Sequence, residues 1–289
     1  MLNSWLHKLF ILKLTPQSAA MQVFLANSAW QFITHIKPVF GHQHCYLCHQ
    51  HSQQIVCHYC FDTFVERGFG QHHLSNQDLL RNPSALKNLD TPNYDHLYAI
   101  DNYIWPIDKL VLDMKFARKP IAARVLTIMF MRFVFWPCIA LPSSTSPGLV
   151  AFIPTLNDLA DLTYGGTKIK DIPQLLVPVP LSNKRYWQRQ YNQAQLLCDQ
   201  LSKATHIPNK AIVQRIKHTL AQTQLDKQRR IENVDNAFKC DVVLNLKHIA
   251  VIDDVITTGV TINAVCRAIK THNPTVKISV WTMAITLLN

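Results

Sequence analysis

The sequence predicts an α/β protein in which a parallel sheet with flanking helices follows a small four-cysteine zinc ribbon. Short apolar runs alternate with helical patterns from Leu175 onward, which is typical of a parallel sheet. An acidic pair, Asp253 and Asp254, ends one of these runs and is followed by a hydroxyl-rich loop. Upstream, four of the eight cysteines fall in two CxxC pairs, a spacing that indicates a metal site.

Length and composition limit the classes of protein that fit the chain. Its 289 residues are enough for one large domain or two small ones. Because 48% of the residues are hydrophobic, the chain can bury a sizeable core and is not wholly disordered. Lys and Arg outnumber Asp and Glu by 29 to 18, a net charge of +11 that favours phosphate-bearing partners or, less specifically, an anionic membrane.

The first part of the chain is predicted to be a helical extension over residues 1–40, because apolar residues between Met21 and Ile36 recur at helical spacings. Lys8 and Lys13 interrupt the early apolar stretch, which argues against a signal peptide. The remaining cysteines are scattered singly, which favours a reducing compartment. We therefore expect a cytoplasmic protein.

Residues 125–141 are apolar enough to raise the question of a membrane span. Arg132 and Pro137 interrupt the stretch, and no unbroken run approaches the roughly 20 residues that a span needs. The pattern favours a buried helix, and we expect no membrane span.

The remaining organisation follows from changes in composition. We expect a zinc-ribbon module at 41–73, a polar linker at 74–93, and a sheet domain at 94–289 with a Pro-rich insertion at 141–174. After a strand and helices in 94–134, the sheet domain is expected to continue with strands at 175–181, 211–213, 248–252 and 276–285, and helices at 191–203 and 260–271.

The two CxxC pairs predict a closed structural metal site for Zn²⁺. A CxxC turn directs two thiolates at one ion, and two such turns complete a tetrahedral site with no open position for catalysis. A redox CxxC pair and four unrelated buried thiols are the alternatives, and a neighbouring His (His44, His49 or His58) remains open as a replacement ligand. The expected ligands are Cys45, Cys48, Cys57 and Cys60.

The acidic pair and the loop after it suit a sugar phosphate. An apolar strand delivers Asp253 and Asp254 to its carboxyl end, where open α/β sheets bind ligands. The loop then leads into a helix, whose N-terminal N–H groups and nearby hydroxyls form a phosphate cradle. The alternative is an Asp-Asp turn with a Thr N-cap. The cradle residues are Thr257, Thr258, Gly259 and Thr261.

A strongly basic stretch covers residues 168–231, with 12 basic and 3 acidic residues. The aromatic residues Tyr186, Trp187 and Tyr191 are interleaved there with Arg185 and Arg189. Basic groups with stacking rings suit single-stranded nucleic acid. The alternative is a solvated helix face whose rings are buried in the core.

Taken together, these motifs resemble known families. The acidic and threonine string resembles the phosphoribosyl pyrophosphate (PRPP) signature of type I phosphoribosyltransferases. The wider pattern over residues 38–284 is similar to the ComF family, in which an N-terminal zinc ribbon precedes such a domain. Gln190 stands where that family usually has Gly. The matching segments are 177–181, Arg185, 189–193, a pattern from Arg215 to Phe238, and Tyr103, Pro106 and the Lys115-Phe116 pair.

The resemblance implies a type I phosphoribosyltransferase-like fold with a PRPP site at the acidic pair and its loop. Ser182 and Arg185, just after a strand, are placed to hold pyrophosphate. The polar stretch 214–232, which includes Arg230, resembles the loop that closes over PRPP in this fold. Mg²⁺ would be carried mostly by the diphosphate. The nucleic-acid-binding candidates are Lys184, Arg185, Trp187, Arg189 and Tyr191.

The ComF family is associated with natural transformation and DNA uptake in bacteria. The resemblance therefore implies a DNA-uptake factor that binds PRPP and single-stranded DNA, with other DNA-uptake proteins as possible partners. The alternative is an active phosphoribosyltransferase, although no residue set specifies an acceptor base. A transcriptional regulator that senses PRPP has less support, because no helix-turn-helix is evident in the sequence.

Overall fold

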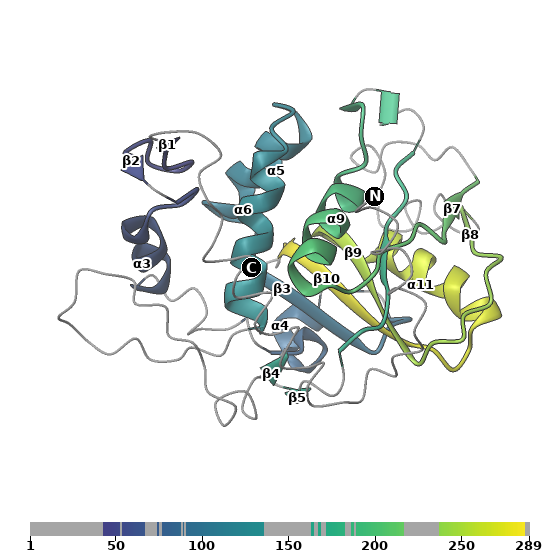
Figure 1. Ribbon diagram of the computed structural model, residues 1–289. Helices are drawn as coiled ribbons and strands as arrows, with labels where there is room; N and C mark the ends of the chain where they lie inside the picture. Colours follow the sequence, from purple (N-terminus) through teal and green to yellow (C-terminus); the bar gives the residue numbers. More distant parts are fainter. Residues whose placement is uncertain are drawn as a thin grey trace, which may run out of the picture.

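The computed structural model describes most of the regions that carry the predicted motifs (Figure 1). The predicted extension at 1–40, most of the 141–174 insertion, and Lys184, Arg185 and Arg230 lie outside the described residues. The structure describes residues 43–52, 54–66, 74, 77–87, 89, 91–135, 163–164, 167–168, 172–182, 186–187, 189–216 and 237–286.

A four-stranded parallel sheet forms the centre of the molecule. Its two inner strands are almost continuously buried, as expected for strands that are covered on both faces. This arrangement confirms the predicted α/β class. In spatial order the strands are β3 (His96–Asn102), β10 (Lys277–Ile285), β9 (His248–Ile256) and β6 (Leu176–Pro178).

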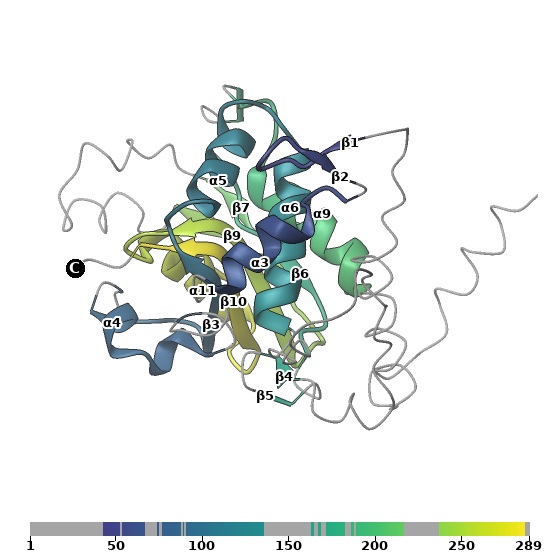
Figure 2. The same ribbon diagram turned by 90° about the vertical axis from the view of Figure 1, so that its left-hand side faces the viewer.

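Helices cover both faces of this sheet (Figures 1 and 2). On one face, Ala250 and Ile252 of β9 pack in a cluster with three helices, and on the other, Ile249 and Val251 pack with a fourth. This alternation follows from the two-residue period of a strand. The three helices are α5 (Ile107–Lys115), α6 (Ile121–Phe130) and α9 (Gln193–Thr205), and the fourth is α11 (Val260–His272).

The apolar stretch predicted as a buried helix begins in α6 and continues as a π-helical turn, η3 (Met131–Phe135). Every side chain from Val125 to Phe130 is buried in the core. Among the described residues, no helix has the length and apolar character needed to cross a membrane.

The segment expected to be a linker is packed against the sheet domain instead. It forms a 3-10 helix, η2 (Leu79–Arg81), and a short helix, α4 (Pro83–Leu86), with Leu79 fully buried. Asp78 caps η2 and also accepts a hydrogen bond from the backbone N–H of Leu97 in β3 at 3.0 Å. The polar residues that suggested a linker therefore include caps of short helices, which a composition argument does not distinguish from a loop.

Several short elements complete the described chain. β1 (Gln43–His44), β2 (His51–Ser52) and α3 (His58–Glu66) form the cysteine module. The strand expected at 211–213 is found one residue later, as β7. Ile212 and Val213 are buried in the core but belong to no strand. The other short pairs are antiparallel: β4 (Thr163–Tyr164) with β5 (Thr167–Lys168), and β7 (Gln214–Arg215) with β8 (Phe238–Lys239).

The turn before α9 has a left-handed residue at the position where the ComF family usually has Gly. Gln190 has φ 68°, and the next residues lead to Asn192, whose side chain caps α9 and donates to the Val179 carbonyl at 2.9 Å. The turn therefore keeps the conformation that suits Gly, although this chain has a residue with a Cβ.

Replacing Gln190 by Gly is expected to raise the free energy of unfolding by about 0.5–1 kcal/mol. A left-handed conformation costs a non-Gly residue roughly 1–2 kcal/mol, and the greater chain entropy of Gly offsets part of that relief. Denaturant unfolding measures the change. The control is Gln190→Ala, which keeps the strain and removes the bond from the Gln190 Nε2 to the Trp187 carbonyl (2.7 Å). Equal stability of the two variants would contradict the explanation.

Candidate functional site

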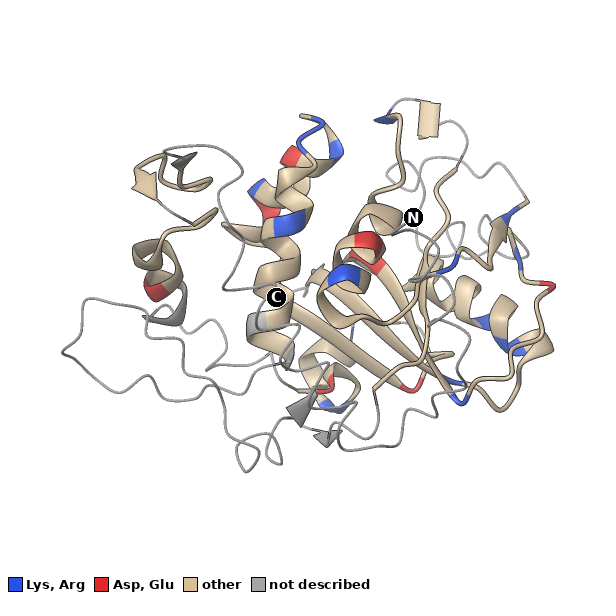
Figure 3. Cartoon of the chain, viewed as in Figure 1, with Lys and Arg blue, Asp and Glu red and all other residues tan. Residues whose placement is uncertain are grey.

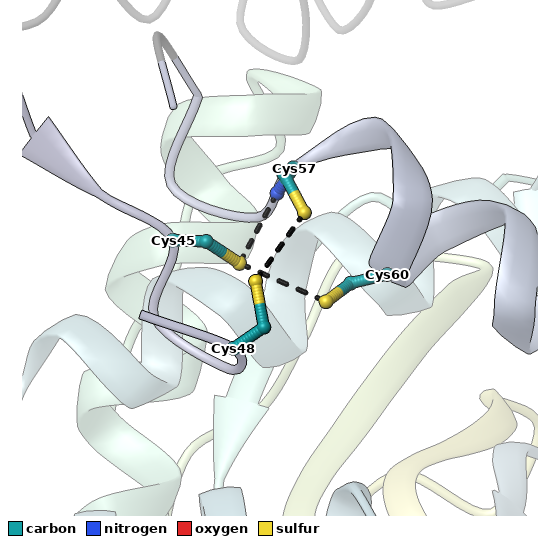
Figure 4. A group of neighbouring side chains, drawn as sticks. All are labelled: Cys45, Cys48, Cys57 and Cys60. Carbon is teal, nitrogen blue, oxygen red and sulfur yellow. Dashed lines mark hydrogen bonds between the residues drawn. The ribbon is translucent and has the colours of Figure 1, made fainter. Parts of the chain in front are cut away.

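The four predicted metal ligands meet at one point. The ligand atoms of Cys45, Cys48, Cys57 and Cys60 all lie within 4.8 Å of one another (Figure 4). Two come from the loop after β1, one immediately precedes α3, and one lies in the first turn of α3. The Sγ atoms of Cys45 and Cys60 are 3.8 Å apart, and those of Cys48 and Cys57 are 3.6 Å apart. In the described residues, the group includes no His.

This donor set fits a tetrahedral thiolate-bound metal ion. With Zn–S bonds of about 2.3 Å, the sulfurs of a regular tetrahedron are about 3.8 Å apart, close to the two separations found here. The backbone N–H of Cys57 donates to the Cys45 Sγ at 3.3 Å. Burial would raise the pKa of the Cys45 thiol, but hydrogen bonds from backbone N–H groups lower the pKa to about 7. The thiolate form of Cys45 is thus accessible near neutral pH, whereas burial raises the pKa of the Cys57 and Cys60 thiols, which would lose their protons on binding a metal ion.

The cysteine module is docked on α5 and α6. Cys45 and Cys57, with Ile55 and Val56, are buried in the same apolar cluster as these helices. The Tyr46 hydroxyl, between the first two ligands, donates to Asp113 of α5 at 2.9 Å. Burial would raise the pKa of Asp113, but hydrogen bonds from Lys109 and Tyr46 lower it below its ordinary value. The ligand loop is therefore held against α5 by both apolar and polar contacts.

The predicted acidic pair lies in the second half of β9, as the sixth and seventh of its nine residues. Ile252 and Val255 pack against the same apolar cluster although they are three residues apart, so the alternation of faces is interrupted at Asp253 and Asp254. The Asp253 Oδ1 accepts a hydrogen bond from the backbone N–H of Asp254 at 2.9 Å. The strand expected to end at Ile252 continues to Ile256, and the acidic pair lies where β9 extends past the last residue of β6, Pro178, which pairs with Ile252. The pair is thus close to the carboxyl edge of the sheet, the edge at which this class of sheet binds ligands.

Ser182, predicted to hold pyrophosphate, follows the neighbouring strand at the same edge. The backbone N–H of Val179 donates to the Ile252 carbonyl at 3.0 Å, so the chain leaving β6 starts beside the acidic pair. Ser182 is half-buried, three residues further along. The chain that leads to Ser182 thus leaves the sheet next to Ile252, the residue before the acidic pair.

A residue that the site prediction did not include is Lys115. Its Nζ lies 2.9 Å from the Asp254 Oδ1, and the two side chains are only 18% and 12% exposed. The pKa of Tyr103 is raised, mainly by burial and then by the negative charges of Asp108 and Asp254. The Lys115-Phe116 pair was part of the motif that resembles ComF proteins, and that motif was the available signal. That Lys115 pairs with Asp254 was not predictable, because 139 positions separate these two residues in the sequence.

The hydroxyl-rich loop leads from β9 into α11 as expected. Gly259 has φ 74° and occupies the N-cap position of α11. The positive φ favours Gly, and a Cβ at this position would lie 3.0 Å from the Leu89 Cδ2, so a larger residue would also require this side chain to shift. Thr257 is exposed and Thr258 and Thr261 are half-buried. The loop therefore leaves hydroxyl groups at the surface beside a helix N-terminus, which carries partial positive charge.

The described part of the basic stretch combines exposed rings with a fixed arginine. Trp187 is 73% exposed and Tyr186 is also exposed, so these two rings are not core residues. Arg189 donates to the Gln193 Oε1 at 3.1 Å. Tyr191 is half-buried, and its hydroxyl donates to the Met114 carbonyl of α5, so this ring anchors the segment.

Fold and site together define an α/β protein with a parallel sheet, an acidic-hydroxyl loop at the carboxyl edge of that sheet, and a docked four-cysteine metal module. The chain is 32% identical over 197 residues to the protein named Competence protein F of Haemophilus influenzae, a match that covers 67% of this chain and 74% of the relative. It is 27% identical to the DNA utilization protein YhgH of Escherichia coli, over 68% of this chain and 74% of the relative. No protein-family model matches the chain. On these similarities the chain belongs to the ComF family.

Proposed function

We propose that this protein acts in DNA uptake during natural transformation, and that it binds a ribose phosphate such as PRPP together with single-stranded DNA. The cellular role is supported by similarity to relatives named Competence protein F and DNA utilization protein YhgH. The observation that carries the ligand proposal is the juxtaposition of Asp253 and Asp254 with the Gly259 loop at one end of β9.

The chemistry of this juxtaposition matches a phosphorylated ribose. Carboxylates accept hydrogen bonds from vicinal hydroxyls, and the loop before α11 supplies hydroxyls and N–H groups for the 5′-phosphate. In this proposal Ser182, Arg185 and Arg230 contribute to holding the diphosphate. Mg²⁺ would enter with the diphosphate, since this ion keeps most of its ligands from phosphate and water. In this proposal Cys45, Cys48, Cys57 and Cys60 hold a structural Zn²⁺.

Calorimetric titration of the protein with PRPP and Mg²⁺ tests the ligand proposal. Saturable binding of one PRPP per chain is the expected result, and no binding with the metal site loaded would overturn it.

The same mixture, supplemented with single-stranded DNA or nucleobases, also tests the enzymatic alternative. Pyrophosphate released in proportion to an added acceptor would identify the protein as a phosphoribosyltransferase rather than a binding protein.

Single-stranded DNA is proposed to bind along the basic and aromatic segment that precedes α9, with Lys184, Arg185, Trp187, Arg189 and Tyr191 as the contributing residues. We expect the affinity to fall steeply with salt, because phosphate contacts release counterions. Arg189→Ala combined with Trp187→Ala should weaken binding and reduce the salt slope. The matched control is Arg267→Ala with Tyr59→Ala, an exposed cation and ring elsewhere. A flat salt response, measured by fluorescence anisotropy, would count against DNA binding.

A further inference from the structure

Phe116 is an exposed aromatic residue in a fixed position. It follows α5 as the C-cap residue, and its backbone N–H donates to the Leu112 carbonyl at 2.8 Å. Its side chain is 67% exposed, although burying a Phe is worth about 1.5–3 kcal/mol. The described contacts thus fix the backbone of this residue and leave most of its ring in solvent.

A cation from a distant part of the chain lies over this ring. The Arg189 Cζ is 5.3 Å from the Phe116 ring centroid, within the range of a cation–π interaction. Arg189 is in turn held by Gln193, the first residue of α9. The hydroxyl of Tyr191 bonds to Met114, two residues before Phe116. The end of α5 and the segment before α9 are therefore joined by two contacts close to the ring.

The surroundings of the ring are positively charged. Arg118 and Lys119 follow Phe116 and are exposed, and Arg118 lies close enough to Tyr191 to act on its pKa. Figure 3 shows Lys and Arg at the end of α5 and at the start of the segment before α9, at the same end of the molecule. The nearby carboxylate of Asp113 is paired with Lys109 at 2.8 Å and lies 3.8 Å from the Lys119 Nζ, so this one negative charge offsets only part of the positive charge. The charge around Phe116 thus complements an anionic partner.

We propose that Phe116, with Arg189 beside it, is a stacking platform for an unpaired base of single-stranded nucleic acid. The inference rests on the proposed DNA binding and extends that surface from the segment before α9 onto the end of α5. Arg189 lies over one face of the ring, so a base would stack on the other face, and the arginine and the two following cations offer charge to the adjoining phosphates. A base inside a duplex has no free face, so the platform selects single strands.

Phe116→Ala tests the platform in the full-length protein loaded with zinc. Stacking is worth about 1–3 kcal/mol per base, so affinity for a short thymidine oligonucleotide should fall roughly 5- to 100-fold. Phe116→Trp should restore binding. The matched control is Tyr59→Ala, because Tyr59 is 66% exposed but belongs to α3 of the cysteine module. An abasic oligonucleotide of equal charge should bind the wild-type and Phe116→Ala proteins equally.

The outcomes separate this inference from the proposed function. If the wild-type protein fails to bind the oligonucleotide, the DNA-binding proposal falls, and the platform with it. If the wild-type protein binds, and Phe116→Ala binds as tightly while melting at the same temperature, only the platform is overturned. An equal loss of affinity for the abasic strand would also overturn it, because that loss indicates a contact with the backbone or a general disturbance of the surface.

Discussion

Replacing both Asp253 and Asp254 by Ala is expected to abolish PRPP binding. Hydrogen bonds to charged groups contribute about 1.5–3 kcal/mol each, so losing two carboxylates should weaken binding by at least about 100-fold. Calorimetry with the wild-type and variant proteins, both with metal bound, measures this effect. No other change proposed for this chain should affect the ligand affinity as strongly, because the two side chains would contact the ribose directly.

The control for this prediction must account for Lys115. Removing the Asp254 carboxylate leaves a largely buried ammonium group without its partner, which destabilises the fold for reasons unrelated to the ligand. Asp254→Asn combined with Lys115→Met removes both charges and keeps the side-chain volumes. Asp241→Ala is the surface control, because its pair with Lys239 is exposed on both sides. Wild-type affinity in a folded Asp253→Ala, Asp254→Ala protein would rule out the ligand site.

Cys57→Ser is expected to release the metal ion and to destabilise the N-terminal module. Structural zinc contributes about 10–16 kcal/mol to the folding of small zinc modules, and a hydroxyl is a poor substitute for a thiolate. Metal analysis after dialysis should give one zinc per wild-type chain and much less in the variant. The melting temperature should fall as well, since Ile55 and Val56 pack in the core cluster with α5 and α6.

Cys240→Ser is the matched control for the metal prediction. Cys240 is also a buried free cysteine, but it lies outside the group of four. This variant should keep one zinc per chain even if its stability falls slightly. If the wild-type protein, purified without chelators, holds no metal, or if Cys57→Ser keeps its metal, the assignment of a structural zinc site is wrong.

Much of the sheet domain was predictable because its elements are continuous and strongly patterned. The helix expected at 260–271 is α11, Val260–His272, and the strand expected at 276–285 is β10, Lys277–Ile285. The two CxxC pairs were equally informative, because such spacing constrains the thiolates before any tertiary packing. The segment at 74–93 was wrongly expected to be a linker, since short capped helices leave little periodicity to detect.

The sequence by itself determined the α/β class, the four cysteines of the candidate metal site, and the acidic pair followed by a hydroxyl-rich loop with Gly259. These features depend on local spacing or on one strand or loop. Only the tertiary structure decided that Lys115 pairs with Asp254, that Arg189 lies over Phe116, and that Tyr46 joins the metal loop to α5. Each of these contacts joins segments far apart in the chain, and it forms only when the helices have packed on the sheet, so its geometry depends on the whole core rather than on any local pattern.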